Sequence, residues 1–201
     1  EDGLPFYTRE YIDGIPLSPG PTGPRGQARP REFLRPILDL LDALQYLHTH
    51  EMLHLDVHAG NLIEARDPSR GAVLIDLGLG QLGRSRSSSG TGKIASSLPP
   101  ELLAGEAPGP AADIHSAGRL LLYRLSGHRE GSARLPREIQ GWGSRLTLEL
   151  ERIIEKAIQP DPAHRFHSAQ EFREALSAAL GEREGHAPPV EPGELTLGRD
   201  P

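Results

Sequence analysis

The segment His54-Leu-Asp-Val-His-Ala-Gly-Asn61 carries more polar side chains than a packed core accommodates. Directly after it, residues 61–75 contain two short apolar runs separated by the turn-forming sequence R-D-P-S-R-G. Such residues between two apolar runs are typical of a β-hairpin. Asp76 follows the second run. Because a hairpin folds back on itself, Asn61 and Asp76 are predicted to be neighbours at its open end.

The side chains of Asn61 and Asp76 indicate a metal-binding site. An Asn and an Asp beside a second Asp offer oxygen ligands, which suit a hard cation. Mg²⁺ fits best, because it takes one or two carboxylates and leaves its other positions to phosphate and water. Asp56, before Asn61, is then placed to orient or deprotonate a hydroxyl group next to the metal.

The rest of the chain is predicted to be mainly helical. From Arg31, apolar residues recur at spacings of three and four up to Leu47, which predicts a helix of about five turns. Pro36 is tolerable only near the start of that helix. Further helical patterns cover 113–126, about 147–158 and 168–180, the last with Ser168 as N-cap and Glu171 completing a capping box.

Other segments read as irregular. Residues 4–14 have the composition of a short strand that runs into a turn, whereas residues 14–30 are so rich in Gly and Pro that no regular element is expected. Residues 80–97 are predicted to form a long loop. The last twenty residues are predicted to be a linker. Residues 194–201 alternate as a strand does, which indicates either a further domain beyond them or a disordered tail with accidental alternation.

Composition excludes several function classes. The chain has 201 residues and a net charge of −6, which argues against a nucleic-acid partner. It has no Cys, so disulfides, thiol nucleophiles and Cys-ligated metals are excluded. No apolar run approaches the roughly 18 residues of a membrane span. The expectation is a soluble cytoplasmic protein, and the nine His show no H-E-x-x-H pattern that would indicate zinc.

Together these features resemble the eukaryotic-type (Hanks-type) protein kinase family, in its bacterial Ser/Thr form. Five motifs, in the family's order and near its spacing, carry the resemblance over residues 4–180: His54-Leu-Asp56 with Asn61 (H-R-D-x-x-x-x-N), Asp76-Leu-Gly78 (D-F-G), Leu98-Pro-Pro-Glu101 (A-P-E), Asp113-Ile-His-Ser-Ala-Gly118 (the start of the buried central helix) and Pro160-Asp-Pro-Ala-His-Arg165. Any one motif alone would be weak, and the set is specific.

The resemblance implies an α+β fold: the mainly α-helical C-terminal lobe of a protein kinase, with a short β-hairpin at the catalytic loop. It implies ATP and Mg²⁺ as cofactors and transfer of the γ-phosphate to Ser or Thr of protein substrates. Asp56 would be the catalytic base, with His58 beside the transferred phosphate. Asn61 and Asp76 would hold Mg²⁺.

The same resemblance assigns supporting roles. The backbone of Glu10 and Ile12 would meet adenine at the hinge, and Ile63 would also line the nucleotide site. Glu101 and Arg165 would form a structural ion pair. Asp113 would brace the backbone of the catalytic loop.

The sequence also departs from the family. Most of the N-terminal lobe has no counterpart, including the Gly-rich loop, the strand Lys and the helix Glu. Leu55 replaces the catalytic-loop Arg that usually pairs with a phosphorylated activation loop, and His58 replaces a Lys. Ile94 replaces an expected Thr, and Arg9 replaces a smaller residue beside adenine.

Two alternatives therefore stand beside the protein kinase. One is a pseudokinase or docking module without turnover. The other is a small-molecule phosphotransferase, because His-x-Asp-x-His-x-x-Asn also resembles the catalytic loop of aminoglycoside and choline kinases. The long segment from Asp76 to Glu101 and the pairing with Arg165 favour the protein kinase over the second alternative. The retention of Asp56, Asn61 and Asp76 argues against the first.

The predicted organisation follows from these motifs. Residues 1–14 form the end of the N-lobe and the hinge, and 15–30 a Pro/Gly-rich segment. The C-lobe covers 31–180, with an activation segment at 76–101, and 181–201 is the linker. Adenine normally lies between two lobes, so we expect a missing N-lobe or partner over the upper face.

Overall fold

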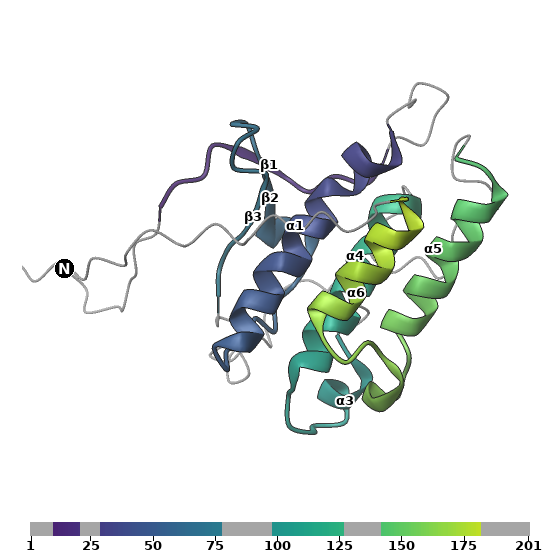
Figure 1. The fold of residues 1–201 in the computed structure, drawn as a ribbon. Coiled ribbons are helices and arrows are strands. Elements are labelled where there is room, and N and C mark those ends of the chain that lie inside the picture. The colour runs from purple at the N-terminus through teal and green to yellow at the C-terminus, as the bar shows by residue number, and fades with distance from the viewer. Residues whose placement is uncertain (1–9, 21–28, 78–97, 127–141, 182–201) are drawn as a thin grey trace, which may run out of the picture.

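The computed structural model describes residues 10–20, 29–77, 98–126 and 142–181. Within these ranges the chain forms a small antiparallel sheet and a group of α-helices (Figure 1). In chain order the elements are β1 (Gly14–Pro16), α1 (Pro30–Thr49), β2 (Leu62–Ala65), β3 (Ala72–Leu74), α3 (Pro100–Leu103), α4 (Pro110–Ser126), α5 (Ser144–Ala157) and α6 (Ala169–Ala179). Short 3₁₀ turns cover Ala59–Asn61 and Pro162–His164. The α+β class and the mainly helical character expected from the sequence are confirmed.

Helix α1 forms where the apolar periodicity predicts it. Its Leu and Ile side chains at spacings of three and four are buried, and Pro30 occupies the first helical position, where a missing N–H costs nothing. Pro36 lies deeper than expected, in the second turn. Its missing N–H removes one hydrogen bond from the helix, and its buried ring packs in the core instead.

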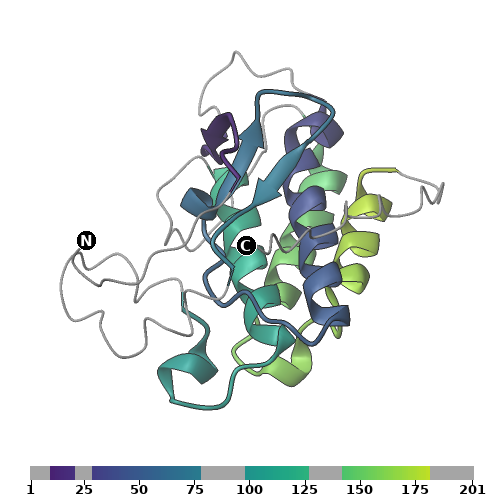
Figure 2. The same ribbon diagram turned by 90° about the vertical axis from the view of Figure 1, so that its left-hand side faces the viewer.

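The predicted hairpin is confirmed by the pairing of β2 with β3, in which Leu62 lies opposite Leu74 and Ile63 opposite Val73. The expectation of no regular element in 14–30 is wrong at its first residues, because β1 pairs antiparallel with β2 and makes a three-stranded sheet. Because Gly and Pro are rare in strands, the sequence pattern does not predict this strand. An edge strand tolerates both, since pairing depends on backbone groups that β2 supplies. Figure 2 shows the sheet lying beside α1.

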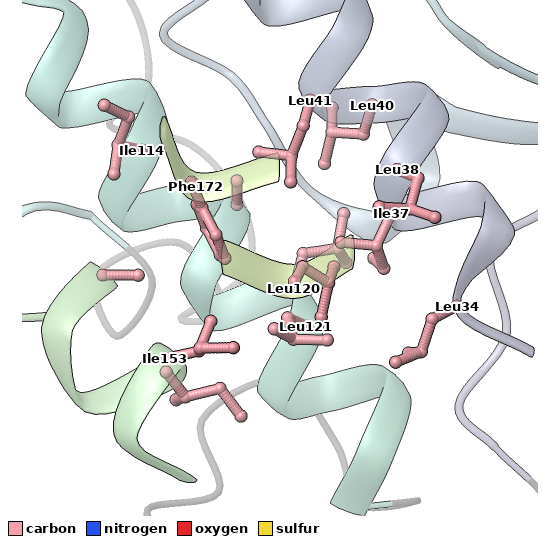
Figure 3. Packing of buried hydrophobic residues seen from close by; sticks show 14 of the residues in the cluster. Leu34, Ile37, Leu38, Leu40, Leu41, Ile114, Leu120, Leu121, Ile153 and Phe172 are labelled. Atoms are coloured by element: carbon pink, nitrogen blue, oxygen red, sulfur yellow. The ribbon is translucent and has the colours of Figure 1, made fainter. Parts of the chain in front are cut away.

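The core lies among helices α1, α4, α5 and α6. Phe172 of α6 is fully buried between side chains of the other helices (Figure 3). Gly118 of α4 faces α5 so closely that a Cβ atom would come within 2.6 Å of the Ala157 side chain. Burying one Leu, Ile or Phe contributes about 1.5–3 kcal/mol. This core makes the helices a stable platform for the loops at their ends.

Helix α6 begins at the predicted cap. Ser168 Oγ accepts a hydrogen bond from the backbone N–H of Glu171 at 3.0 Å. The Glu171 carboxylate reaches back one residue further than in a standard capping box and accepts from His167 N–H at 2.7 Å. It also pairs with Lys156 of α5, at 2.7 Å.

Several predicted features lie outside the described residues: Arg9, the whole 80–97 loop with Ile94, and the linker at 182–201 with its strand-like end. In the part of the chain that is described, no helix has both the length and the apolar character that spanning a bilayer requires.

Candidate active site

Asp113, in the first turn of α4, holds the loop that contains Asp56. Its fully buried carboxylate accepts hydrogen bonds from the backbone N–H groups of His54, at 2.9 Å, and Leu55, at 2.7 Å. Leu55 has a φ of 59°, a left-handed conformation that costs energy for a residue with a side chain. The two hydrogen bonds hold that conformation in place. The brace expected from the sequence is confirmed.

Two histidines complete the support of this loop. His48, at the end of α1, contacts Asp113 Oδ2 through Nε2 at 2.9 Å. The buried His54 ring accepts from Asp56 N–H through Nδ1, at 3.3 Å, so its proton lies on Nε2, which donates to the carbonyl oxygen of Ile75 at 3.0 Å. His54 therefore ties the catalytic loop to the residue before Asp76.

Asp56 and Asn61 lie in direct contact. The Asn61 amide nitrogen donates to the Asp56 carboxylate oxygen Oδ2 at 3.0 Å and to the Asp56 carbonyl oxygen at 2.9 Å. Both N–H bonds of the amide are thereby directed at Asp56. The amide oxygen of Asn61 then remains as its atom for binding a ligand.

His58 lies on the other side of Asp56. Its Nδ1 accepts from Gly60 N–H at 3.0 Å, so the ring proton lies on Nε2, which stands 3.7 Å from Asp56 Oδ1. Hydrogen bonding to His58 is the largest influence that lowers the pKa of Asp56 below its ordinary value, and Asn61 adds to it. Asp56 is therefore a carboxylate at neutral pH, as a proton acceptor must be.

The hairpin brings the chain just before Asp76 next to Asn61, at the open end of the β2–β3 pair. The backbone N–H of Ile75 donates to the Asn61 carbonyl oxygen at 2.9 Å, which closes the open end of the β2–β3 pair. Asp76 follows with a φ of 64°, so the chain turns sharply there. This backbone arrangement is the one that the sequence predicts for the two candidate metal ligands.

This oxygen donor set fits Mg²⁺. Across the described ranges no group of three or more His, Asp or Glu side chains is arranged to hold a metal ion. A site of one carboxylate and one amide oxygen, completed by phosphate and water, needs no such group. The directed Asn61 amide is the observation that fits such a site best.

The residues assigned to the nucleotide lie on the sheet side of the loop. Ile63 of β2 is buried and pairs with Pro16 of β1 and Val73 of β3. Glu10 and Ile12 lie in the segment just before β1, where Ile12 is half-buried. The Glu10 carboxylate accepts a hydrogen bond from the Arg70 guanidinium.

The predicted ion pair between Glu101 and Arg165 is confirmed. The two guanidinium nitrogens of the buried Arg165 each lie 2.7 Å from one carboxylate oxygen. The remaining donors of Arg165 reach the carbonyl oxygens of Gln159, Ala111 and Pro160. Burial is the largest single influence and raises the pKa of Glu101, but the hydrogen bonds from Arg165, a backbone hydrogen bond and the charge of Arg165 together outweigh it, so the pKa lies below its ordinary value.

His115 lies beside this pair without adding charge to it. Burial, followed by the neighbouring Arg165, lowers the pKa of His115 to about 4. The ring is therefore neutral at pH 7, and Arg165 is the cation that Glu101 meets. The pair anchors α3 to the chain between α5 and α6.

Sequence reasoning missed two of the groups that support this site. Asp39 of α1 accepts from the Ala72 N–H at 2.9 Å and fixes the start of β3. Arg124 of α4 pairs with Glu64 of β2 at 3.1 Å and donates to the Ser18 carbonyl oxygen at 2.8 Å. Each contact joins segments far apart in the chain, so no local pattern reveals it.

Comparison with known proteins agrees with this geometry. Residues 24–176 match the family model of the protein kinase domain. The chain is 28% identical over 206 residues to serine/threonine-protein kinase F of Synechocystis, covering 94% of this chain and 39% of that protein. It is 28% identical over 202 residues to serine/threonine-protein kinase PknB of Mycolicibacterium smegmatis, covering 92% and 31%. The chain thus spans about a third of the length of these curated relatives.

Solved structures support the fold. The crystal structure of the Mycobacterium tuberculosis PknI kinase domain matches with a TM-score of 0.61 at 23% identity, covering 86% of this chain and 65% of that one. At this identity the likeness speaks for the fold alone. Since the family model covers most of the chain and includes the braced loop, the hairpin and the buried ion pair, the chain belongs to the protein kinase family.

Proposed function

We propose that this chain is the catalytic part of a serine/threonine protein kinase, which transfers the γ-phosphate of ATP to a Ser or Thr hydroxyl of a protein substrate. One observation carries the proposal: the loop braced by Asp113 presents an ionised Asp56 in contact with Asn61. The Ser/Thr kinases among its relatives support this function over a small-molecule phosphotransferase.

Each residue has a defined task. Asp56 accepts the proton of the substrate hydroxyl as that oxygen attacks phosphorus. Asn61 keeps the Asp56 carboxylate oriented, and His58, whose Nε2 stands 3.7 Å from Asp56 Oδ1, would lie beside the transferred phosphate. Asn61 and Asp76 would hold Mg²⁺, which neutralises phosphate charge when bound. The backbone of Glu10 and Ile12, with Ile63, would receive the adenine.

The proposal includes a partner for the sheet side. Tyr11 and Ile15 are 83% and 59% exposed, and both are large apolar residues at or beside β1. Exposed apolar side chains of this kind mark contact surfaces. We assign this surface to an N-terminal lobe, which would supply the second wall of the adenine site. With ATP as the phosphate donor and a signalling role, the proposed kinase would act in the cytoplasm.

The test is the binding of a non-hydrolysable ATP analogue, measured by calorimetry on the whole protein with and without Mg²⁺. The wild type should bind with Mg²⁺, and Asp76→Asn should weaken binding at least about tenfold, because a charged ligand to the metal is lost. Asp161→Asn, an exposed aspartate next to Pro162, is the control and should bind as the wild type does. Undiminished affinity of Asp76→Asn would remove the metal role.

A further inference from the structure

The hairpin turn (residues 66–71) contacts the chain segment that is assigned to adenine. We call residues 10–13 the hinge segment. The backbone N–H of Arg66 donates to the carbonyl oxygen of Asp13 at 2.8 Å, which extends the pairing of β1 with β2 by one residue beyond Gly14 and Ala65. The side chains of Arg66 and Asp13 also face each other, at 3.8 Å.

A second contact lies at the other end of the hinge segment. The two terminal nitrogens of Arg70 donate to the two carboxylate oxygens of Glu10, at 2.6 and 3.2 Å. Two parallel hydrogen bonds between guanidinium and carboxylate fix direction as well as distance. Each partner raises the preference of the other for its charged form: the pKa of Glu10 lies below its ordinary value and the pKa of Arg70 above.

The turn that carries Arg70 is itself held by hydrogen bonds. Asp67 Oδ1 accepts from the backbone N–H of Ser69 at 2.9 Å and from its hydroxyl at 2.8 Å. The Arg70 N–H donates to the Asp67 carbonyl oxygen at 3.1 Å. The Arg70 side chain therefore extends from an ordered backbone. Its contact with Glu10 also orders the hinge segment.

The contact between Arg70 and Glu10 lies at the turn of the hairpin whose other end carries the candidate metal ligands, so it can affect nucleotide binding. The strands that leave the turn, β2 and β3, end at Asn61 and Asp76, the candidate metal ligands. One hairpin thus holds the metal ligands at its open end and the hinge segment at its turn. We propose that Arg70 is a positioning residue for nucleotide binding, which holds the backbone of Glu10 and Ile12 in register with Asn61 and Asp76. This inference rests on the proposed function.

The effect should appear in nucleotide affinity and not in folding. Both side chains are exposed, and exposed ion pairs contribute little to the free energy of unfolding. A hinge segment released by the loss of the pair must be ordered again when the nucleotide binds, and that ordering weakens binding. Because the chemical step does not involve Arg70, the KM for ATP should rise while kcat stays the same.

The experiment measures the affinity for a non-hydrolysable ATP analogue with Mg²⁺, by calorimetry on the whole protein, and the kcat and KM for ATP. We expect Arg70→Gln and Glu10→Gln each to weaken binding about twofold to fivefold, in line with the strength of an exposed ion pair. The double variant Arg70→Glu with Glu10→Arg should recover most of the affinity. Arg145→Gln, which breaks the exposed Arg145–Glu149 pair on α5, is the matched control and should leave binding unchanged.

The outcomes separate this inference from the function on which it rests. If the wild type binds no nucleotide, both the proposed kinase function and the positioning role of Arg70 are wrong. If the wild type binds and the single variants bind equally tightly, the positioning role is wrong and the kinase function stands. If the single variants bind weakly but the double variant does not recover, the Arg70–Glu10 contact is not the cause and the inference is overturned. A melting temperature equal to that of the wild type in all variants shows that folding is not what changed.

Discussion

At the scale of single residues, His58 is the least usual member of the catalytic loop. It stands 3.7 Å from Asp56, and its hydrogen bonding is the main influence that lowers the Asp56 pKa. A carboxyl whose pKa is depressed stays ionised down to a lower pH, and it loses its charge only as the pH falls through that lowered value. Because even the ordinary aspartate pKa of 3.8 lies well below 7, Asp56 would stay ionised at neutral pH without His58.

This gives a prediction about pH. His58→Ala should move the pKa of Asp56 up toward the ordinary aspartate value of 3.8, since the largest lowering influence is gone. Carboxyl ¹³C NMR titration of Asp56 measures the change, and His50→Ala, at the end of α1, is the control. A loss of rate at pH 7 in His58→Ala then reports contact with the phosphate, because Asp56 remains ionised. An unchanged Asp56 pKa would contradict the assignment.

Leu55 supports a second prediction at this scale. Where the family usually has Arg, this loop has an apolar side chain, and its backbone is held by Asp113 without any charge from residue 55. A phosphate in the activation segment therefore lacks its usual counter-charge beside Asp56. Treatment of the purified protein with a phosphatase should change its rate by less than about twofold. A fall of an order of magnitude or more would contradict this prediction.

At the scale of elements, the buried pair of Glu101 and Arg165 joins α3 to the chain before α6. Removing one partner of a buried pair leaves a charge without compensation and costs about 3–5 kcal/mol. Glu101→Gln should lower the free energy of unfolding by about that amount, as measured by urea denaturation. The control Glu149→Gln disrupts the exposed Arg145 pair and should cost less than about 1 kcal/mol. Equal effects of the two variants would show that the Glu101 pair does not anchor α3.

The pairs and elements differ in how far the sequence predicts them. The repeat of apolar residues along α1 and the Ser168 cap of α6 are local, so their helices are predictable within a few residues. The strand β1 is not, because Gly14 and Pro16 disfavour a strand, Ile15 alone favours one, and the segment pairs only when β2 is beside it. Tertiary context there overrides local preference.

The candidate site shows the same division. The spacing of Asp56, Asn61 and Asp76 and the hairpin between them are visible in the sequence, as is the resemblance that links Glu101 to Arg165. The contact between Arg70 and Glu10 joins residues 60 apart, and Arg70 reads in the sequence only as a turn residue. Long-range side-chain pairing of this kind becomes visible only when the fold places the turn next to the hinge segment.

At the scale of the whole molecule, the helices form the platform, the sheet lies beside α1, and the catalytic loop runs between them (Figures 1 and 2). Asp113 from α4, His48 from α1 and His54 from the loop itself fix the backbone around Asp56. The sheet brings the candidate metal ligands together and leaves apolar side chains exposed at β1. This arrangement is that of a kinase C-lobe, and under the proposed function its upper face would receive the nucleotide.

The most direct test of the kinase function is phosphotransfer from γ-labelled ATP by the whole protein, followed by identification of the labelled amino acid. The account predicts Mg²⁺-dependent label on Ser or Thr of a general protein substrate. It also predicts a loss of at least about 100-fold for Asp56→Asn, because positioned general-base catalysis contributes about that much or more. The contradicting result is a wild-type protein that binds the nucleotide yet labels no Ser or Thr, or an Asp56→Asn variant that labels them at the wild-type rate.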